Sequence, residues 1–214
     1  SLSTSLSGAL LLSLRNMENI AALQEFLKTP RNIVITTHQK PDGDAMGSSL
    51  ALYNYLQPLG HEVRVISPTE FPAYFGYLPG CDEVWNYLEN PSLSQIAIES
   101  AELIFCLDFN DLGRIEPLNE FIKKNETAKL VLIDHHLNPQ IDAEWILHDT
   151  KACSTCELVY RLLEILEPAY VPTKEVSECI YTGILTDTAS FSNGATSKKA
   201  LEITAHLLDR KSVV

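Results

Sequence analysis

The sequence predicts an α/β protein with a mostly parallel, Rossmann-like sheet and helices on both faces. Short apolar runs rich in β-branched residues recur along the chain, and segments with apolar residues at helical spacing lie between or after them. Near-continuous apolar strands that alternate with helices are typical of parallel sheets covered on both sides. With 214 residues, of which 45% are hydrophobic and 21% charged, the chain can bury a sizeable core.

Four segments have the pattern of buried strands. The first, "NIVITT", is a short β-branched run, and the last two end in an acidic residue or in histidine. The four predicted strands are Asn32–Thr37, His61–Ser67, Glu102–Asp108 and Lys129–His136.

Helical patterns follow the first strand and fill the C-terminal third of the chain. The first predicted helix has apolar residues at helical spacing from Ala45 to Leu59 and ends by Gly60. Residues 67–100 are rich in proline, glycine and aromatic residues, which predicts an irregular insertion over the sheet. The three remaining predicted helices are at about Ser154–Leu166, Thr173–Leu185 and Ser197–Leu208.

The net charge and the number of cysteines limit which partners the protein can bind and in which compartment it is expected. The net charge of −12 argues against a broad basic face that grips nucleic acid, because that mode of binding depends on Lys and Arg. Five cysteines do not make a secreted disulfide framework, so a reducing, cytoplasmic location is expected. A membrane partner is not expected, because the apolar piece Ala9–Leu14 is too short to span a bilayer. A homodimer is compatible with the sequence.

Residues 1–16 are interpreted as a tag or upstream extension, with Met17 as the expected natural start. Residues 17–214 are then expected to form one folded domain, because the sequence has no internal repeat and no second core pattern.

Acidic residues and histidines gather where the predicted strands end. In a parallel sheet these ends meet at one edge, where ligands bind. Carboxylates brought together there repel one another and stay ionised only if cations lie among them. Mixed carboxylate and imidazole groups suit manganese, zinc or iron-group ions. The residues concerned are His38, Asp42, Asp44, Asp108, Asp134, His135 and His136.

The spacing H-x-x-x-D-x-D after the first strand suits two ions. His38 and Asp42 can reach one ion, while Asp44 points to a second, as in two-metal sites that clamp a phosphoryl group and activate water. Gly43 is expected to relieve a tight turn, and Gly47 to let the helix approach the sheet closely. Each aspartate alone could equally be a helix cap or a turn residue. Three strand ends with such residues are difficult to explain by caps and turns.

Four motifs in this order resemble those of the DHH phosphoesterases. They are "HQKPDGDAMGS", the aspartate of "FCLD", "IDHH" and "GILTDTASF", and the resemblance covers roughly residues 33–208 of the chain. Within the family, the chain is most similar to the RecJ-like nanoRNases, which also remove the 3′-phosphate of 3′-phosphoadenosine 5′-phosphate.

The resemblance implies a role for each matching residue. His38 and Asp42 would bind the first metal, Asp108 would bridge both metals, and His136 would face the substrate phosphate as charge stabiliser or proton donor. Asp134 would orient a ligand histidine from behind. The remaining ligands, all of the second metal, would be Asp44, His135 and Asp187, of which Asp187 reads locally as an ordinary helix end.

Two departures from the family pattern stand out. Residue 189 is alanine where relatives often have glycine, a mild change that is not expected to disable the site. These phosphoesterases also carry a second domain with a Gly-rich, His-containing loop and basic residues, and nothing like it occurs before Val214. The chain is therefore expected to be the N-terminal domain of a longer protein.

Two further features have simple interpretations. "CSTC", residues 153–156, is interpreted as the start of a helix rather than a zinc or redox motif, since a second ligand pair is absent. Arg114 could contact substrate phosphate, although a solvated loop arginine is the default interpretation. No Gly-rich phosphate loop followed by lysine is present, which excludes P-loop hydrolases.

The expected function is that of a phosphoesterase with two divalent ions, manganese being the expected metal. Its expected substrates are short RNA oligonucleotides or a 3′-phosphorylated mononucleotide, attacked by a metal-activated hydroxide. The alternatives are a pyrophosphatase or exopolyphosphatase, a cyclic-dinucleotide phosphodiesterase, and a non-catalytic nucleotide-binding module.

Overall fold

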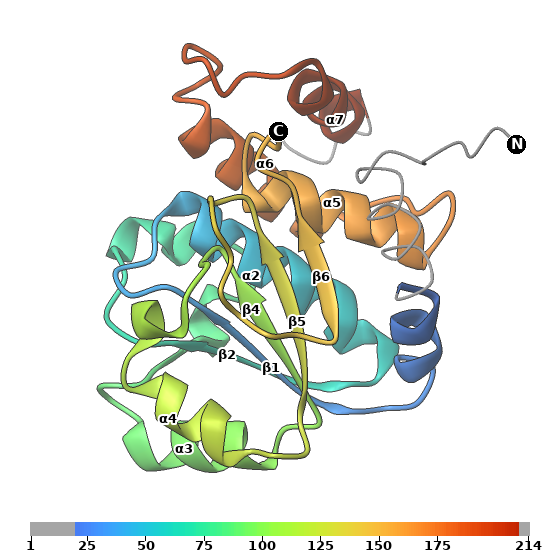
Figure 1. Cartoon of the computed structure of the whole chain (residues 1–214). Helices are drawn as coiled ribbons and strands as arrows, with labels where there is room; N and C mark the ends of the chain where they lie inside the picture. Colours follow the sequence, from blue (N-terminus) through green and yellow to red (C-terminus); the bar gives the residue numbers. More distant parts are fainter. Residues whose placement is uncertain (1–19, 210–214) are drawn as a thin grey trace, which may run out of the picture.

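The computed structural model describes residues 20–209, so the expected extension at 1–16 and Met17 lie outside the described residues. Within this range six strands form one parallel sheet in the order β3-β2-β1-β4-β5-β6 (Figure 1). This is the doubly wound order, in which successive strands are added outward in opposite directions from β1 and β4. The predicted fold class is confirmed.

The strands are short, and the residues of the two central strands are almost all buried. In β4 every residue is buried, as expected for a strand covered on both faces. The register pairs Ile35 with Val65 on one side and with Phe105 on the other. The bounds are β1 Asn32–Thr37, β2 Glu62–Ser67, β3 Trp85–Asn86, β4 Leu103–Leu107, β5 Lys129–Asp134 and β6 Trp145–His148.

Helices cover the sheet on both faces, in two separate apolar layers (Figure 1). Ile33 and Ile35 point to the layer built with α2, α5 and α6, while Val34 between them points to the layer of α3 and α4. This alternation follows from the two-residue period of a strand. The helices are α2 Gly43–Leu56, α3 Pro91–Ser100, α4 Leu118–Lys124, α5 Thr155–Leu166, α6 Lys174–Asp187 and α7 Lys198–Asp209.

The prediction of an irregular insertion at 67–100 is wrong for part of that segment. It supplies the edge strand β3, which pairs with β2, and the ten-residue helix α3. Pro91 occupies the first turn of α3, where its missing N–H costs nothing, and Ile98 packs into the core on that face. A strand of two residues is too short to show a periodic pattern in the sequence. The prediction of irregular structure therefore rested on the proline, glycine and aromatic residues of the segment.

Glycines let α2 and α6 pack closely, which differs from the roles expected for them. A Cβ atom at Gly47 would lie 2.5 Å from the carbonyl oxygen of Cys179, so the close neighbour is α6 and not the sheet. A Cβ atom at Gly43 would lie 2.5 Å from the side chain of Thr186, and Gly43 is a helical residue of α2 rather than part of a tight turn. The two glycines therefore bring the end of α6 beside the start of α2. None of the described helices is long and apolar enough to cross a membrane.

Candidate metal centre

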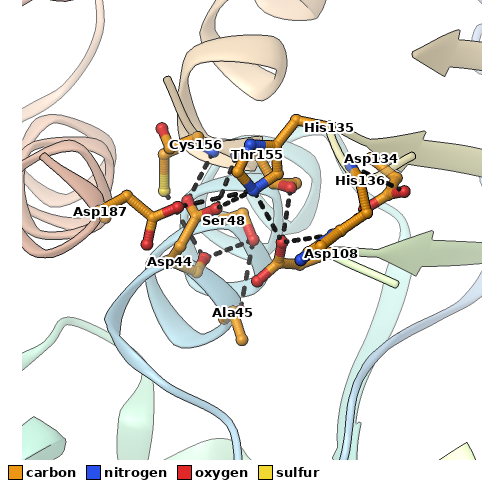
Figure 2. A network of polar contacts seen from close by, with 12 residues as sticks. Asp44, Ala45, Ser48, Asp108, Asp134, His135, His136, Thr155, Cys156 and Asp187 are labelled. Atoms are coloured by element: carbon orange, nitrogen blue, oxygen red, sulfur yellow. Dashed lines mark hydrogen bonds and ion pairs between the residues drawn. The ribbon is translucent and has the colours of Figure 1, made fainter. Parts of the chain in front are cut away.

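The carboxyl ends of β1, β4 and β5 bring the predicted side chains to one edge of the sheet. β1 and β4 are the neighbours at which the strand order reverses, the place where doubly wound folds bind ligands. His38 follows β1, Asp108 follows β4, and Asp134 ends β5 immediately before His135 and His136. The start of α2 and the end of α6 complete the edge: Asp42 is the N-cap of α2, and Figure 2 shows Asp44 and Asp187 beside the strand-end residues.

One candidate ligand group consists of His38, Asp42 and Asp108. The Nε2 atom of His38 lies 3.9 Å from Oδ1 of Asp42 and 3.5 Å from Oδ2 of Asp108. The Nδ1 atom of His38 lies 2.7 Å from the carbonyl oxygen of Gln39, which can only accept, so Nδ1 donates. The neutral imidazole therefore presents the lone pair of Nε2 to the two carboxylates, the tautomer that a metal ligand needs.

Asp42 has a second role, because it is also the N-cap of α2. Its Oδ1 atom accepts hydrogen bonds from the amides of Asp44 and Ala45 at 3.1 and 3.0 Å. The cap fixes the side chain toward the strand end. Asp42 therefore both caps α2 and belongs to the cluster.

A second candidate group consists of Asp44, His135 and Asp187. The Nε2 atom of His135 lies 3.7 Å from Oδ2 of Asp44 and 3.5 Å from Oδ2 of Asp187. The same nitrogen lies 3.5 Å from Oδ1 of Asp108. Asp187 thus belongs to the cluster, although it comes from the last residue of a helix about 140 residues further along the chain than Asp44.

His136 makes a third group with Asp108 and His135, with 3.7 Å between its Nδ1 atom and Oδ1 of Asp108. Asp134 holds His136 from behind: its Oδ1 accepts from Nδ1 over 2.7 Å, and its Oδ2 accepts from the backbone amide over 3.2 Å. The carbonyl oxygen of His136 also accepts a 2.6 Å hydrogen bond from His148. The Asp134 carboxylate therefore pairs with the second histidine of the motif.

Asp108 lies at the centre of all these contacts. Its Oδ2 atom faces His38, and its Oδ1 atom faces both His135 and His136. It is 2% exposed, and its backbone adopts the left-handed region at φ 65°, which costs a non-glycine residue about 1–2 kcal/mol. This conformation, at the exit of β4, belongs to the one carboxylate that two groups share.

Crowded carboxylates shift the acid–base chemistry of the cluster. Burial, together with Asp108 and Asp187, raises the pKa of Asp44 well above its ordinary value. Burial and the nearby Asp108 raise the pKa of Asp187 to about 6. For His135, burial favours the neutral ring, but the Asp108, Asp44 and Asp187 carboxylates outweigh it and raise the pKa to about 9. The pocket thus favours positive charge, whether from protons or from a metal.

The pKa of Asp108 shifts in the opposite direction to those of Asp44 and Asp187. Burial raises the pKa of an aspartate, but the contacts of Asp108 with His135 and His38 outweigh it and lower the pKa below the ordinary value. The pKa of His38 is correspondingly raised against the effect of burial, chiefly by Asp108. The central carboxylate is therefore an anion between two imidazoles.

The donor set fits divalent ions. Two atoms that each lie about 2.1 Å from one ion are at most about 4.2 Å apart. The histidine nitrogens and carboxylate oxygens of the first two groups are 3.5–3.9 Å apart, too long for hydrogen bonds and within that limit. Nitrogen and oxygen donors together suit manganese, iron or zinc better than calcium.

Residues at the start of α5 support the cluster, and sequence reasoning missed them. The backbone amides of Thr155 and Cys156 donate to the two oxygens of Asp44 at 2.6 and 2.8 Å. The Thr155 hydroxyl donates to Oδ1 of Asp108 over 2.9 Å. The only local signal is the S-x-x-E pattern of Ser154 and Glu157, which marks the start of a helix and does not point to the metal cluster.

The remaining sequence features lie near the site or behind it. Ser154 caps α5, and Cys153 and Cys156 are buried free thiols, so the interpretation of "CSTC" as a helix start is confirmed. Arg114 is exposed, and its carbonyl oxygen accepts from the amide of Gln39 at 3.0 Å, beside the loop of His38. Ala189 has φ 46°, a left-handed conformation that glycine adopts at lower cost.

Comparison with known proteins agrees with this geometry. Residues 32–184 match the DHH family, N-terminal domain. The chain is 32% identical over 91% of its length to the bifunctional oligoribonuclease and PAP phosphatase NrnA of Thermus thermophilus, and 31% identical over 82% to that of Bacillus subtilis. It covers 55% and 52% of these two proteins, so it spans about half the length of the curated relatives it matches.

Solved structures give the same result. An exopolyphosphatase-related protein from Bacteroides fragilis superposes with a TM-score of 0.85 at 32% identity, over 98% of this chain and 59% of that one. The exonuclease RecJ bound to manganese shares the fold, with a TM-score of 0.56 at 16% identity, over 91% of this chain and 47% of that one. The four ordered motifs bring their side chains to one edge of the sheet, as described above. The match over residues 32–184 shows that the chain belongs to the DHH family.

Proposed function

We propose that this chain carries the catalytic metal centre of a manganese-dependent phosphoesterase that hydrolyses short oligoribonucleotides and 3′-phosphoadenosine 5′-phosphate. The observation that carries the proposal is that Asp108 and His135 link three groups of potential metal-ligating side chains at one sheet edge, since each of the two residues belongs to two of the groups. The substrates are those named for the relatives from Thermus thermophilus and Bacillus subtilis.

His38 and Asp42 are the proposed ligands of the first ion, and Asp44, His135 and Asp187 those of the second. Asp108 is the proposed bridge, since its two oxygens face different histidines. When bound, two divalent ions lower the pKa of a water molecule and neutralise the charge on a phosphoryl group. The protein's own part is to hold these side chains in place at the sheet edge, where Asp44 and Asp108 are buried and Asp42 is exposed.

His136 is proposed to act on the substrate phosphate. Its Nδ1–H donates to Asp134, so Nε2 is the other end of the ring, and it donates to a phosphate oxygen or to the leaving oxygen when the ring carries a proton on both nitrogens. Arg114, exposed beside the His38 loop, is proposed to bind a phosphate group of the substrate through its guanidinium.

The full protein is proposed to hold its substrate with a second, C-terminal domain. The chain as a whole has a net charge of −12. A separate basic surface would meet the phosphates of an oligonucleotide. A cytoplasmic location is proposed as well, because all five cysteines are free thiols.

The test is a substrate panel for the full-length protein, freed of metal and assayed with and without added manganese. Dinucleotides and 3′-phosphoadenosine 5′-phosphate are compared with pyrophosphate, polyphosphate and cyclic dinucleotides, in the wild type and in Asp108→Ala. Manganese-dependent turnover of the first two that disappears in Asp108→Ala is the expected result. Turnover of pyrophosphate or polyphosphate alone would assign an alternative activity, and manganese binding without turnover of any substrate would favour a binding module.

A further inference from the structure

The N-terminal turn of α5 lies against the metal cluster, with Thr155 and Cys156 beside Asp44 (Figure 2). The first amides of a helix have no partner within the helix and need one outside it. In α5 the Ser154 side chain accepts from the amide of Glu157, while the amides of Thr155 and Cys156 donate to Asp44. Two of the first three amides of α5 therefore donate hydrogen bonds to a proposed metal ligand.

Both oxygens of Asp44 are fixed in this way. Oδ2 accepts from Thr155 over 2.6 Å and Oδ1 accepts from Cys156 over 2.8 Å, in a site where Asp44 is completely buried. A carboxylate held at both oxygens cannot rotate freely. The positive end of the α5 dipole also favours negative charge at this position.

The hydroxyl of Thr155 extends the same contact to the second carboxylate. It donates to Oδ1 of Asp108 over 2.9 Å, the oxygen that faces His135. An ionised carboxylate only accepts, so the hydroxyl hydrogen points to Asp108 and holds Oδ1 on the side of His135. Oδ2 is left facing His38.

The capping of α5 does not account for the Thr155 hydroxyl. Ser154 and Glu157 cap the helix, since Glu157 accepts from the amide of Cys153 at 2.8 Å and Ser154 accepts from the amide of Glu157 at 3.1 Å. The Thr155 side chain, by contrast, reaches a residue 47 positions away in sequence. Thr155 is 0% exposed, so water does not compete for this bond.

We propose that Thr155 is a positioning residue, whose amide and hydroxyl orient Asp44 and Asp108 so that their free lone pairs converge on the two ions. This inference rests on the proposed function, because it concerns how the same centre binds its metals. Groups that orient metal ligands typically change metal affinity by about 10–100-fold when they are removed.

The experiment measures manganese binding to the metal-free chain by electron paramagnetic resonance, without substrate. Thr155→Val keeps the shape of the side chain and loses the hydroxyl, and it should weaken at least one of two manganese sites about tenfold. Thr155→Ser keeps the hydroxyl and should bind within about threefold of the wild type. Ser154→Ala, the matched control, removes the cap of the same helix and should lower thermal stability while leaving manganese affinity unchanged.

The outcomes separate the two proposals. If Thr155→Val is folded by circular dichroism and binds both ions as the wild type does, the positioning role is wrong while the metal centre stands. If the wild type itself binds no manganese, the proposed function fails and this inference falls with it. If Thr155→Val does not fold, Thr155→Ala serves instead, because it also lacks the hydroxyl and does not place a methyl group against the Asp108 carboxylate.

Discussion

The Asp134 carboxylate accepts a 2.7 Å hydrogen bond from Nδ1 of His136, and a second one from the backbone amide of the same residue. This pair fixes both the tautomer and the ring orientation of the histidine proposed to act on phosphate. Asp134 is fully buried at the end of β5, so the bond is shielded from water. The relationship predicts what happens when the carboxylate is replaced by an amide.

In Asp134→Asn the side chain keeps its shape but can present an NH₂ group to His136. We expect kcat to fall by about 10–100-fold with both manganese ions still bound, because orientation of His136 is lost while the proposed ligands are untouched. Steady-state kinetics and a manganese titration measure the two effects. Asp149→Asn is the control, since Asp149 pairs with Arg161 and belongs to none of the ligand groups. If kcat is unchanged in Asp134→Asn, the orientation of His136 by Asp134 does not contribute to catalysis.

Replacing the shared carboxylate should affect the site more severely. Asp108→Asn keeps the side-chain volume but loses the negative charge that faces His38 and His135. We expect the protein to bind fewer than two manganese ions and turnover to fall roughly a thousandfold, equivalent to about 4 kcal/mol of transition-state stabilisation. Asp111→Asn, which changes a capping aspartate three residues further along, should keep both ions and normal turnover. Two tightly bound ions in Asp108→Asn would contradict a bridging role.

The raised pKa of His135 predicts how pH affects the metal-free protein. Its folded pKa is about 9, against 6.5 ordinarily, so the folded state binds this proton more tightly than the unfolded state does. The resulting stabilisation is complete below pH 6.5 and is lost as pH rises through 9. Asp187, with a pKa of about 6, titrates below this window. Urea unfolding of the metal-free protein should therefore show decreasing stability from pH 6.5 to 9.

Manganese binding should have the opposite dependence, because the ion must displace the proton from His135. Apparent affinity should rise by up to about tenfold per pH unit between pH 6.5 and 8.5. His61→Asn is the control for the stability measurement, since burial lowers the pKa of His61 and keeps it out of the window. His135→Asn should reduce the loss of metal-free stability with pH, and the raised pKa values of Asp44 and His38 account for the part of the loss that remains. A metal affinity that does not change with pH would show that His135 is not a ligand.

Arg114 is the candidate contact to substrate outside the metal cluster. We expect Arg114→Gln to raise KM for 3′-phosphoadenosine 5′-phosphate about 10–100-fold, the effect of losing one charged hydrogen bond, while manganese affinity stays the same. Lys123→Gln, on the exposed side of α4, is the matched control for a change in net charge. An unchanged KM would show that Arg114 does not bind the substrate and is a solvated loop residue.

The residues at the strand ends and at the start of α2 were predictable from local sequence patterns, whereas the contributions of α5 and α6 were not. Asp108 follows five apolar residues, and His135 and His136 follow another apolar run, so local pattern and the rule for parallel sheets place them together. Asp187 has no such signal, because it ends a helix and reaches the site only through the packing of α6 on α2. Thr155 reads as the second residue of a capped helix, and its contact with Asp108 is purely tertiary.

The same packing gives a last prediction, at Gly183 on α6. A Cβ atom there would lie 2.2 Å from Sγ of Cys156 and 2.9 Å from Oδ1 of Asp44, closer than atoms can approach. Alanine normally stabilises a helix interior relative to glycine, by up to about 1 kcal/mol. We expect Gly183→Ala instead to lower the free energy of unfolding by about 1–3 kcal/mol, because the junction of α2, α5 and α6 must open to admit the methyl group.

Gly183→Ala should also weaken manganese binding, since the displaced atoms include an oxygen of Asp44 that the α5 amide holds. Gly76→Ala is the matched control, because an added Cβ atom there meets nothing within 4 Å. Urea unfolding of the metal-free proteins and manganese titrations compare the two variants. A Gly183→Ala protein as stable as the wild type, with unchanged metal affinity, would mean that the junction adapts without moving Asp44, and that the cluster does not depend on this helix packing.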